Sequence, residues 1–96
     1  MSRLAVYLPW LGISQSLALH IAITGTSQGI GLDAAKRLIR DGHTVYHANR
    51  NSARSAEAAQ QAGGGIPMVC DLASLASVRA FADELSTKPL DVLCLN

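Results

Sequence analysis

The residues best suited to chemistry form one run of eight: Thr24-Gly25-Thr26-Ser27-Gln28-Gly29-Ile30-Gly31. Gly25 would let the chain turn sharply, Gly29 would let an anion approach the backbone, and Gly31 would let the next helix pack closely on the preceding strand. Unpaired N–H groups at a helix start, together with the helix dipole, bind phosphate. The hydroxyl groups of Thr26 and Ser27 could add donors. We therefore expect a dinucleotide pyrophosphate to bind here. The alternative is a glycine turn with a purely structural role.

Such a loop needs a strand before it and a helix after it, and the sequence predicts both. Residues 19–23 are a short apolar run, and Ile30, Ala34 and Leu38 recur at helical spacing. The same alternation continues and predicts strands at residues 20–24, 44–48, 66–70 and 90–95. It predicts a first helix at 29–41, with Gly42 after its end, and a second helix that runs from an N-cap at Ser52 or Ser55 to Ala62. A third helix is expected after Ser74, with the apolar stripe Val78, Phe81, Ala82 and Leu85. Helical crossovers between strands imply an α/β fold, a partial doubly wound parallel sheet of Rossmann type with about four strands in the order 3-2-1-4 and three helices.

Composition and charge exclude several other classes. Hydrophobic residues make up 49% of the 96 residues, which is enough to form a core and makes a disordered chain unexpected. The formal net charge is only +1 and the basic residues are scattered, so nucleic acid is not an expected partner. His20, His43 and His47 have no Glu or Cys at metal-ligand spacing, so no metal is expected. Cys70 and Cys94 lie in apolar runs and are expected to be buried, reduced thiols.

Residues 1–18 precede the predicted dinucleotide-binding domain at residues 19–96. They are apolar but interrupted by Pro9 and Gly12, and too short to span a bilayer. Arg3, the apolar middle and the small residues at 16–18 loosely match a targeting peptide. We expect either an N-terminal lead or a targeting segment, in an intracellular, cytoplasmic protein, with organelle or secretory targeting as the alternative.

The last predicted strand raises the question of what lies beside it. Val92, Leu93, Cys94 and Leu95 are all apolar, which suits a strand in a sheet covered on both faces. In the order 3-2-1-4 this strand would lie at an edge, where a flat apolar strand promotes aggregation. We therefore expect further strands after Asn96, in a longer protein of which this chain is a part.

The glycine spacing and two later segments together resemble one protein family. Gly-x-x-x-Gly-x-Gly is neither the Walker loop, which needs Gly-Lys-Ser/Thr, nor the tighter Gly-x-Gly-x-x-Gly of long dehydrogenases. Thr24–Gly31, the pair Asp71-Leu72 and residues 90–96 resemble the N-terminal portion of the classical short-chain dehydrogenase/reductase family. The last segment resembles the strand that leads into the family's Asn-Asn-Ala-Gly motif, except that Leu95 replaces the first Asn.

The resemblance implies roles for individual residues in holding a nicotinamide dinucleotide. Asp71 would accept from the adenine amino group and Leu72 would form an apolar wall; the alternative for Asp71 is a turn aspartate that bonds backbone amides. Ile30 would point toward the nicotinamide, or lie in the core. Asn96 would hold the loop after the fourth strand through backbone bonds.

Asn49 and Arg50 bear on which dinucleotide is bound. By the resemblance, many members that use NAD have an acidic residue at the end of the second strand, where it bonds the ribose 2′-hydroxyl. Here that position is the neutral Asn49, and Arg50 follows it. An arginine can fork onto a 2′-phosphate, although a solvated loop arginine is the alternative. We expect NADP(H) rather than NAD(H).

The resemblance also implies catalytic residues that residues 1–96 do not contain. The family's hydride transfer uses a serine and a Tyr-x-x-x-Lys pair, but Tyr7 is followed four residues later by Leu11, and Tyr46 by Arg50. We expect this chain to be the NADP(H)-binding part of an oxidoreductase, inactive alone on carbonyl substrates. A non-catalytic nucleotide-binding module or degenerate gene product is the alternative. A methyltransferase is disfavoured by the glycine spacing and by Arg50, because a methyl donor carries no 2′-phosphate.

Overall fold

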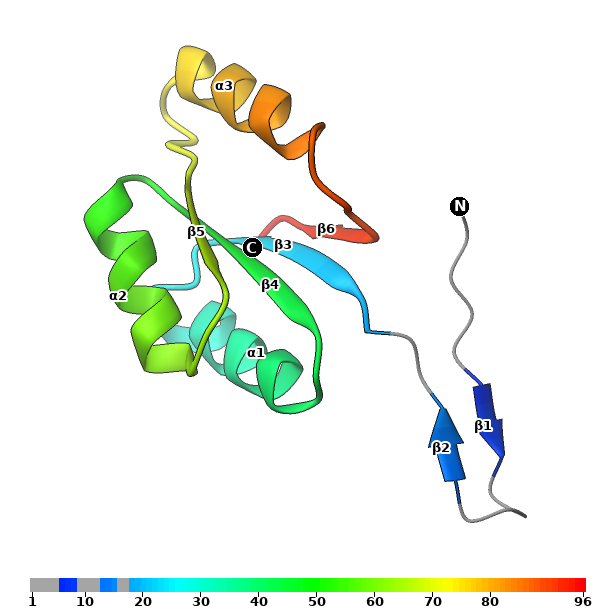
Figure 1. The fold of residues 1–96 in the computed structure, drawn as a ribbon. Coiled ribbons are helices and arrows are strands. Elements are labelled where there is room, and N and C mark those ends of the chain that lie inside the picture. Colours follow the sequence, from blue (N-terminus) through cyan, green and yellow to red (C-terminus); the bar gives the residue numbers. More distant parts are fainter. Residues whose placement is uncertain (1–5, 9–12, 16–17) are drawn as a thin grey trace.

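A computed structural model of the chain describes residues 6–8, 13–15 and 18–96, which contain two sheets (Figure 1). The smaller sheet is an antiparallel pair, β1 (Val6–Leu8) and β2 (Ile13–Gln15). Most of the predicted N-terminal lead, and with it the predicted targeting signal, lies outside the described residues. Within the described ranges, no helix is long and apolar enough to cross a membrane.

The larger sheet has four parallel strands, and its order confirms the prediction. Its strands are β3 (His20–Thr24), β4 (Thr44–Asn49), β5 (Ile66–Val69) and β6 (Val92–Cys94). They lie in the order β5-β4-β3-β6, which is 3-2-1-4 when the strands of this sheet are numbered along the chain. The crossover helices are α1 (Gly29–Arg40), α2 (Ser52–Ala62) and α3 (Leu75–Leu85).

Each face of this sheet has its own core, because successive strand side chains point to opposite faces. On one face the strands pack against α1 and α2, through Ile21, Ile23, Val45, Ala35 and Ala62. On the other face they pack against α3, through Ala22, Tyr46, Ala48, Met68, Cys70, Phe81 and Leu85. The helices thus lie on both faces, as a doubly wound sheet requires (Figure 1).

The N-cap of α2 differs from the prediction. Asn51, rather than Ser52 or Ser55, has the extended backbone of an N-cap, and its side chain accepts from the Arg54 N–H at 2.8 Å. Ser55 is fully buried and its hydroxyl donates to the Met68 carbonyl at 2.5 Å. It therefore ties α2 to β5 instead of capping the helix.

The other helix ends largely follow the sequence. Ser74 caps α3 by accepting from the Ser77 N–H at 3.2 Å, as predicted. Gly42 follows α1 with a φ of +93°, a conformation that favours glycine. In the predicted stripe of α3, Phe81 and Leu85 are buried and Val78 packs against them, but Ala82 is exposed.

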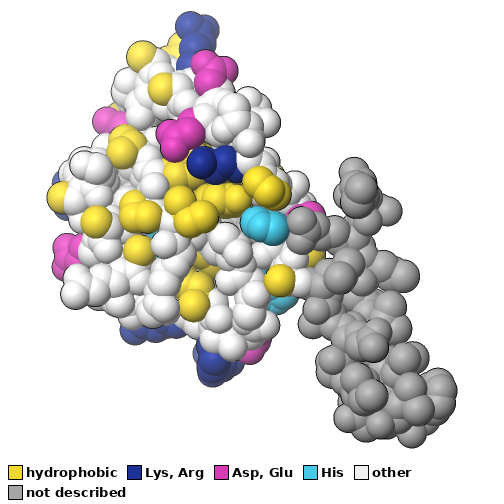
Figure 2. Space-filling model, viewed as in Figure 1, with side chains coloured by type: hydrophobic (Ala, Val, Ile, Leu, Met, Phe, Trp, Pro, Cys, Tyr) yellow, Lys and Arg dark blue, Asp and Glu magenta, His cyan; other side chains and the backbone are white. Residues whose placement is uncertain are grey.

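β6 is shorter and more open than predicted. It pairs with β3 over Val92–Cys94, and in the described chain its side chains are exposed, Cys94 included, contrary to the expected burial of that thiol. Figure 2 shows hydrophobic side chains at the surface on the face of the sheet next to α3, and Leu93 and Leu95 are among the exposed large apolar residues.

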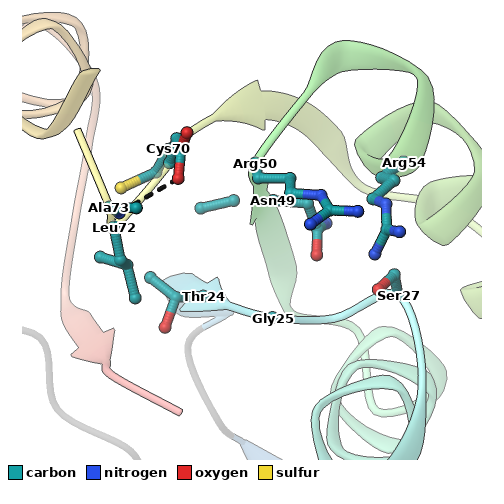
Figure 3. Close-up of a pocket in the computed structure, with 11 residues that line it drawn as sticks. Thr24, Gly25, Ser27, Asn49, Arg50, Arg54, Cys70, Leu72 and Ala73 are labelled. Atoms are coloured by element: carbon teal, nitrogen blue, oxygen red, sulfur yellow. Dashed lines mark hydrogen bonds between the residues drawn. The ribbon is translucent and has the colours of Figure 1, made fainter.

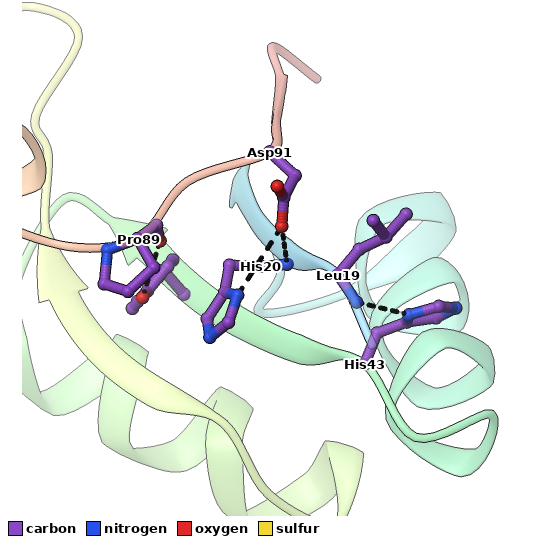
Figure 4. A network of polar contacts seen from close by, with 6 residues as sticks. Leu19, His20, His43, Pro89 and Asp91 are labelled. Carbon is purple, nitrogen blue, oxygen red and sulfur yellow. Dashed lines mark hydrogen bonds and ion pairs between the residues drawn. The ribbon is translucent and has the colours of Figure 1, made fainter. Parts of the chain in front are cut away.

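The residues just before β6 tie down the start of β3 (Figure 4). The Asp91 carboxylate accepts from the His20 N–H at 2.8 Å and lies 3.5 Å from His20 Nδ1, and the Asp91 N–H donates to the His20 carbonyl. Beside them, the Tyr46 hydroxyl donates to the Pro89 carbonyl, and His43 Nδ1 accepts from the Leu19 N–H. These contacts fix the amino-terminal edge of the sheet.

Candidate dinucleotide-binding site

A pocket of about 260 Å³ lies at the opposite, carboxyl-terminal edge of the sheet (Figure 3). Its walls come from the ends of β3, β4 and β5, the glycine loop and the start of α2. The lining residues are Thr24, Gly25, Ser27, Ala48, Asn49, Arg50, Arg54, Cys70, Asp71, Leu72 and Ala73. In open α/β sheets, ligands bind in crevices outside the carboxyl ends of the strands, where the strand order reverses, as it does on either side of β3.

The glycines of the loop are each required by local geometry. Gly25 and Gly29 have φ angles of +70° and +63°, which side chains on L residues disfavour. A Cβ on Gly31 would overlap the Gly25 carbonyl oxygen and lie 2.7 Å from Asn96 Nδ2. The close approach predicted for Gly31 therefore exists, but its partner is the loop and Asn96 rather than the strand.

The N-terminus of α1 is left open toward an anion. Gln28 occupies the N-cap with extended backbone and makes no side-chain capping bond, and no acidic residue lies in the first turn. A Cβ on Gly29 would meet no atom within 4 Å. The first amides of the helix therefore have neither a capping side chain nor a repelling carboxylate, as an N-terminus that binds phosphate needs.

Thr26 is bonded within the chain and does not line the pocket, whereas its partner Asn49 does. Thr26 is fully buried, its N–H donates to Asn49 Oδ1 at 3.0 Å, and its hydroxyl accepts from Asn49 Nδ2 at 3.1 Å. Asn49 Nδ2 also lies 3.3 Å from the Ser55 hydroxyl. Because their side-chain polar groups are bonded within the chain, Thr26 and Asn49 stabilise the glycine loop. The Ser27 side chain lines the pocket and can offer its hydroxyl to a ligand.

Two arginines border the same pocket. Arg50 follows β4 and Arg54 lies in the first turn of α2; both side chains are exposed, and Figure 3 shows them extending over the side of the pocket near Ser27. Among the described residues neither guanidinium is in an ion pair. Arg54 was not among the site residues predicted from the sequence. No local sequence pattern distinguishes Arg54; it becomes a candidate because the start of α2 brings it to the same pocket as Arg50.

Asp71 and Leu72 form the other wall. Asp71 Oδ1 accepts from the Ala73 N–H at 3.0 Å, so the turn role weighed for this residue is present, while the residue also lines the pocket. Leu72 is 61% exposed and available as an apolar surface. Burial, and secondly the charge of Asp71, raises the pKa of the neighbouring Cys70 thiol, which therefore stays protonated at neutral pH.

Two further residues with roles implied by the resemblance, Ile30 and Asn96, lie outside the pocket lining. Ile30 is 82% exposed, so it is not a core residue, and it does not line this pocket. Asn96 donates from Nδ2 to the Gly25 carbonyl at 3.0 Å and from its N–H to the Thr24 hydroxyl at 2.9 Å. Its side chain braces the glycine loop, because β6 runs parallel to β3 and ends beside it. Its expected role in holding the loop after the fourth strand stays a prediction.

Comparison with known proteins agrees with this geometry. Residues 19–96 match the family model described as short chain dehydrogenase. Over 84 residues the chain is 44% identical to the chloroplastic protochlorophyllide reductase of Pisum sativum, and over 96 residues it is 42% identical to dehydrogenase/reductase SDR family member 13 of Bos taurus. These alignments cover 80% and 92% of this chain but 21% and 26% of the relatives.

A solved structure shares the fold as well. The 3-ketoacyl-(acyl-carrier-protein) reductase from Brucella melitensis complexed with NADH matches with a TM-score of 0.67 and 28% identity, over 78% of this chain and 32% of that one. This chain therefore spans less than a third of the length of each of these proteins. The strand order, the glycine loop and these matches together show that the chain belongs to the short-chain dehydrogenase/reductase family.

Proposed function

We propose that this chain binds NADP(H) and forms the cofactor-binding part of a short-chain dehydrogenase/reductase-type oxidoreductase. The observation that carries the proposal is the two guanidiniums of Arg50 and Arg54, which form no ion pair within the described part of the chain, over a pocket that also borders the glycine loop. A dinucleotide with a 2′-phosphate carries negative charge at two places, and the pocket offers a complement to each.

The residues present fit the parts of such a cofactor. The open amides of α1 and the Ser27 hydroxyl would hold the pyrophosphate. Leu72 would cover a face of the adenine and Asp71 would accept from its amino group. When bound, the nicotinamide supplies the hydride carrier of the family's redox chemistry. We assign these residues to binding and not to turnover, because residues 1–96 contain no Tyr-x-x-x-Lys.

Selection of NADP(H) over NAD(H) would come from charge at the end of β4. Arginine binds phosphate through two parallel hydrogen bonds, which a ribose hydroxyl cannot match. The neutral Asn49, with its amide already bonded to Thr26 and near Ser55, places no carboxylate where it would repel the 2′-phosphate. The complex of a related reductase with NADH supports dinucleotide binding at this fold, and the two arginines support the choice of the phosphorylated form.

Calorimetric titration of the full chain with NADPH and with NADH tests this. A charge-assisted hydrogen bond contributes about 1.5–3 kcal/mol, so we expect Arg50→Ala and Arg54→Ala each to raise the Kd for NADPH by roughly tenfold or more, with little change for NADH. Arg79→Ala, an exposed arginine on α3 outside the pocket lining, is the matched control. Equal loss of affinity for both dinucleotides, or none for NADPH, would contradict the assignment of the arginines.

A further inference from the structure

His47 is a buried polar residue that does not line the cofactor pocket. It lies on β4 and is 0% exposed. Its ring fits between the glycine loop and the Gly63–Gly65 run, where a Cβ on Gly65 would overlap the ring. Gly65 also has a φ of +106°, so a glycine there is required both by backbone conformation and by the space that His47 occupies.

The hydrogen bonds of the ring fix which nitrogen carries the hydrogen. Nε2 lies 2.8 Å from the Gly64 carbonyl, which can only accept, so Nε2 must be the donor. Nδ1 lies 2.9 Å from the Thr26 hydroxyl. In a neutral ring Nδ1 is then an acceptor, and the Thr26 hydroxyl donates to it.

The donor and acceptor directions continue without conflict into Asn49. Asn49 Oδ1 accepts from the Thr26 N–H, which identifies Nδ2 as the amide donor that reaches the Thr26 hydroxyl oxygen. One directed chain therefore runs from Asn49 through Thr26 and His47 to the Gly64 carbonyl. It holds both the backbone and the side chain of Thr26, the residue that follows Gly25 in the glycine loop.

The neutral form of the ring is favoured by its surroundings. Burial lowers the pKa of His47, and the hydrogen bond to the Gly64 carbonyl offsets part of this effect. The charged side chains of the helices packed on this face are exposed: Asp33, Lys36, Arg37 and Arg40 on α1, and Arg54 and Glu57 on α2. The other elements around the ring, β3, β5 and the Gly63–Gly65 run, bring no charged side chain to it.

Protonation would reverse one link of this chain. In the imidazolium both nitrogens are donors, so Nδ1 and Asn49 Nδ2 would both donate to the Thr26 oxygen. The Thr26 hydroxyl hydrogen would then lose its acceptor inside a site where Thr26 is fully buried. A buried donor without a partner is costly, so the loop around Thr26 has to move.

We propose that His47 is a positioning residue for the glycine loop: its neutral ring holds Thr26 in place, and uptake of a proton by the ring loosens the loop and weakens dinucleotide binding. The statement about the dinucleotide rests on the proposed function, whereas the statement about the loop does not.

Nuclear magnetic resonance of the full chain without cofactor tests the loop directly. We expect the ring nitrogens of His47 to show the Nε2–H form at pH 7.5. We expect the amide signals of residues 25–29 to shift with the same midpoint as the His47 ring when the pH is lowered. In His47→Asn, Oδ1 replaces Nδ1 as an acceptor that cannot titrate, so this shared shift should vanish. His43→Asn, which changes a histidine that accepts a backbone N–H at the opposite edge of the sheet, should keep it.

NADPH titrations of the same variants give the second measurement. The 2′-phosphate itself titrates with a pKa of about 6, so the useful quantity is the ratio of the wild-type Kd to the His47→Asn Kd at each pH, in which that effect cancels. We expect this ratio to rise about tenfold as the His47 ring becomes protonated, the size of one lost hydrogen bond.

The two measurements separate this proposal from the proposed function. If the amide signals of the glycine loop shift with the same midpoint as the His47 ring, but the chain does not bind NADPH at any pH, the result would support the positioning role and refute the cofactor assignment. Any of three results would overturn the proposal: amide signals of residues 25–29 that do not shift with the midpoint of the His47 ring, a His47 ring with its hydrogen on Nδ1, or a Kd ratio that does not change with pH. Should His47→Asn fail to fold, the agreement of the ring and loop midpoints in the wild-type chain decides.

Discussion

Gly31→Ala is the substitution that most directly tests how the glycine loop is built. The added methyl group would overlap the Gly25 carbonyl oxygen and lie 2.7 Å from Asn96 Nδ2. The Gly25 carbonyl belongs to the backbone of the loop, so it cannot rotate away, and Asn96 Nδ2 can move only by giving up its 3.0 Å bond to that carbonyl. The start of α1 must therefore move away from the loop, or the bond between Asn96 and Gly25 must break.

The expected loss of stability follows from these contacts. Forcing a methyl group into a packed site costs about 1–3 kcal/mol, and a lost hydrogen bond adds about 0.5–1.5 kcal/mol. Replacing a helical glycine by alanine returns up to about 1 kcal/mol of helix propensity. The net expectation is a loss of roughly 0.5–4 kcal/mol in the free energy of unfolding, with NADPH binding weakened by about tenfold or more because the amides of α1 are displaced.

Urea unfolding followed by circular dichroism, with NADPH titration alongside, measures both effects. Gly42→Ala is the matched control: Gly42 has a φ of +93° at the far end of α1, and its Cβ would meet no atom within 4 Å. It should lose about 1–2 kcal/mol through backbone strain while its Kd for NADPH stays unchanged. If Gly31→Ala bound NADPH as tightly as the wild type, or if Gly42→Ala weakened binding equally, the close packing of Gly31 on Gly25 would not be what holds the α1 amides in place for the dinucleotide.

Two further predictions follow from the buried titratable groups. Burial lowers the pKa of His47 below its ordinary 6.5, so as the pH falls the unfolded chain takes up this proton before the folded chain does. The free energy of unfolding is therefore retained above about pH 6.5 and decreases below it, by up to about 1.4 kcal/mol per pH unit. Urea midpoints at pH 7.5 and 5.5 should show a smaller loss in His47→Asn than in the wild type. Iodoacetamide at pH 7.5, read by mass spectrometry, should modify the exposed Cys94 in the folded chain and Cys70 only after unfolding, because burial and the charge of Asp71 raise the pKa of Cys70; rapid alkylation of native Cys70 would contradict this.

Much of the fold was predictable because it depends on local signals. Alternating apolar runs and helical spacings located the strands of the sheet and the helices. The helix-sized crossovers predicted parallel strands, and the Rossmann-type fold predicted the strand order that the structure confirms. The N-cap of α2 was predicted wrongly, because Asn51, Ser52 and Ser55 all suit a cap, and the tertiary contact that takes up the Ser55 hydroxyl cannot be seen in the local sequence.

The candidate site was predictable in its backbone and less so in its side chains. The glycine spacing placed the loop, but the sequence alone could not show that Thr26 faces His47 and Asn49, which lie more than 20 residues further along the chain. Arg54 was missed because a single exposed arginine at a helix start has no distinguishing local pattern. It gains its significance only beside Arg50 and the pocket.

The hydrogen bonds of Asn96 also set an order of events during folding. The glycine loop is complete in sequence once residue 31 has been synthesised, yet its Gly25 carbonyl and the Thr24 hydroxyl are bonded by a residue 71 and 72 positions later. Contacts of such long sequence separation form late, after the entropy of closing the intervening chain has been lost. A nascent chain therefore carries its glycine loop without the Asn96 bonds through the synthesis of α2, β5 and α3. The loop reaches its final form when β6 docks against β3.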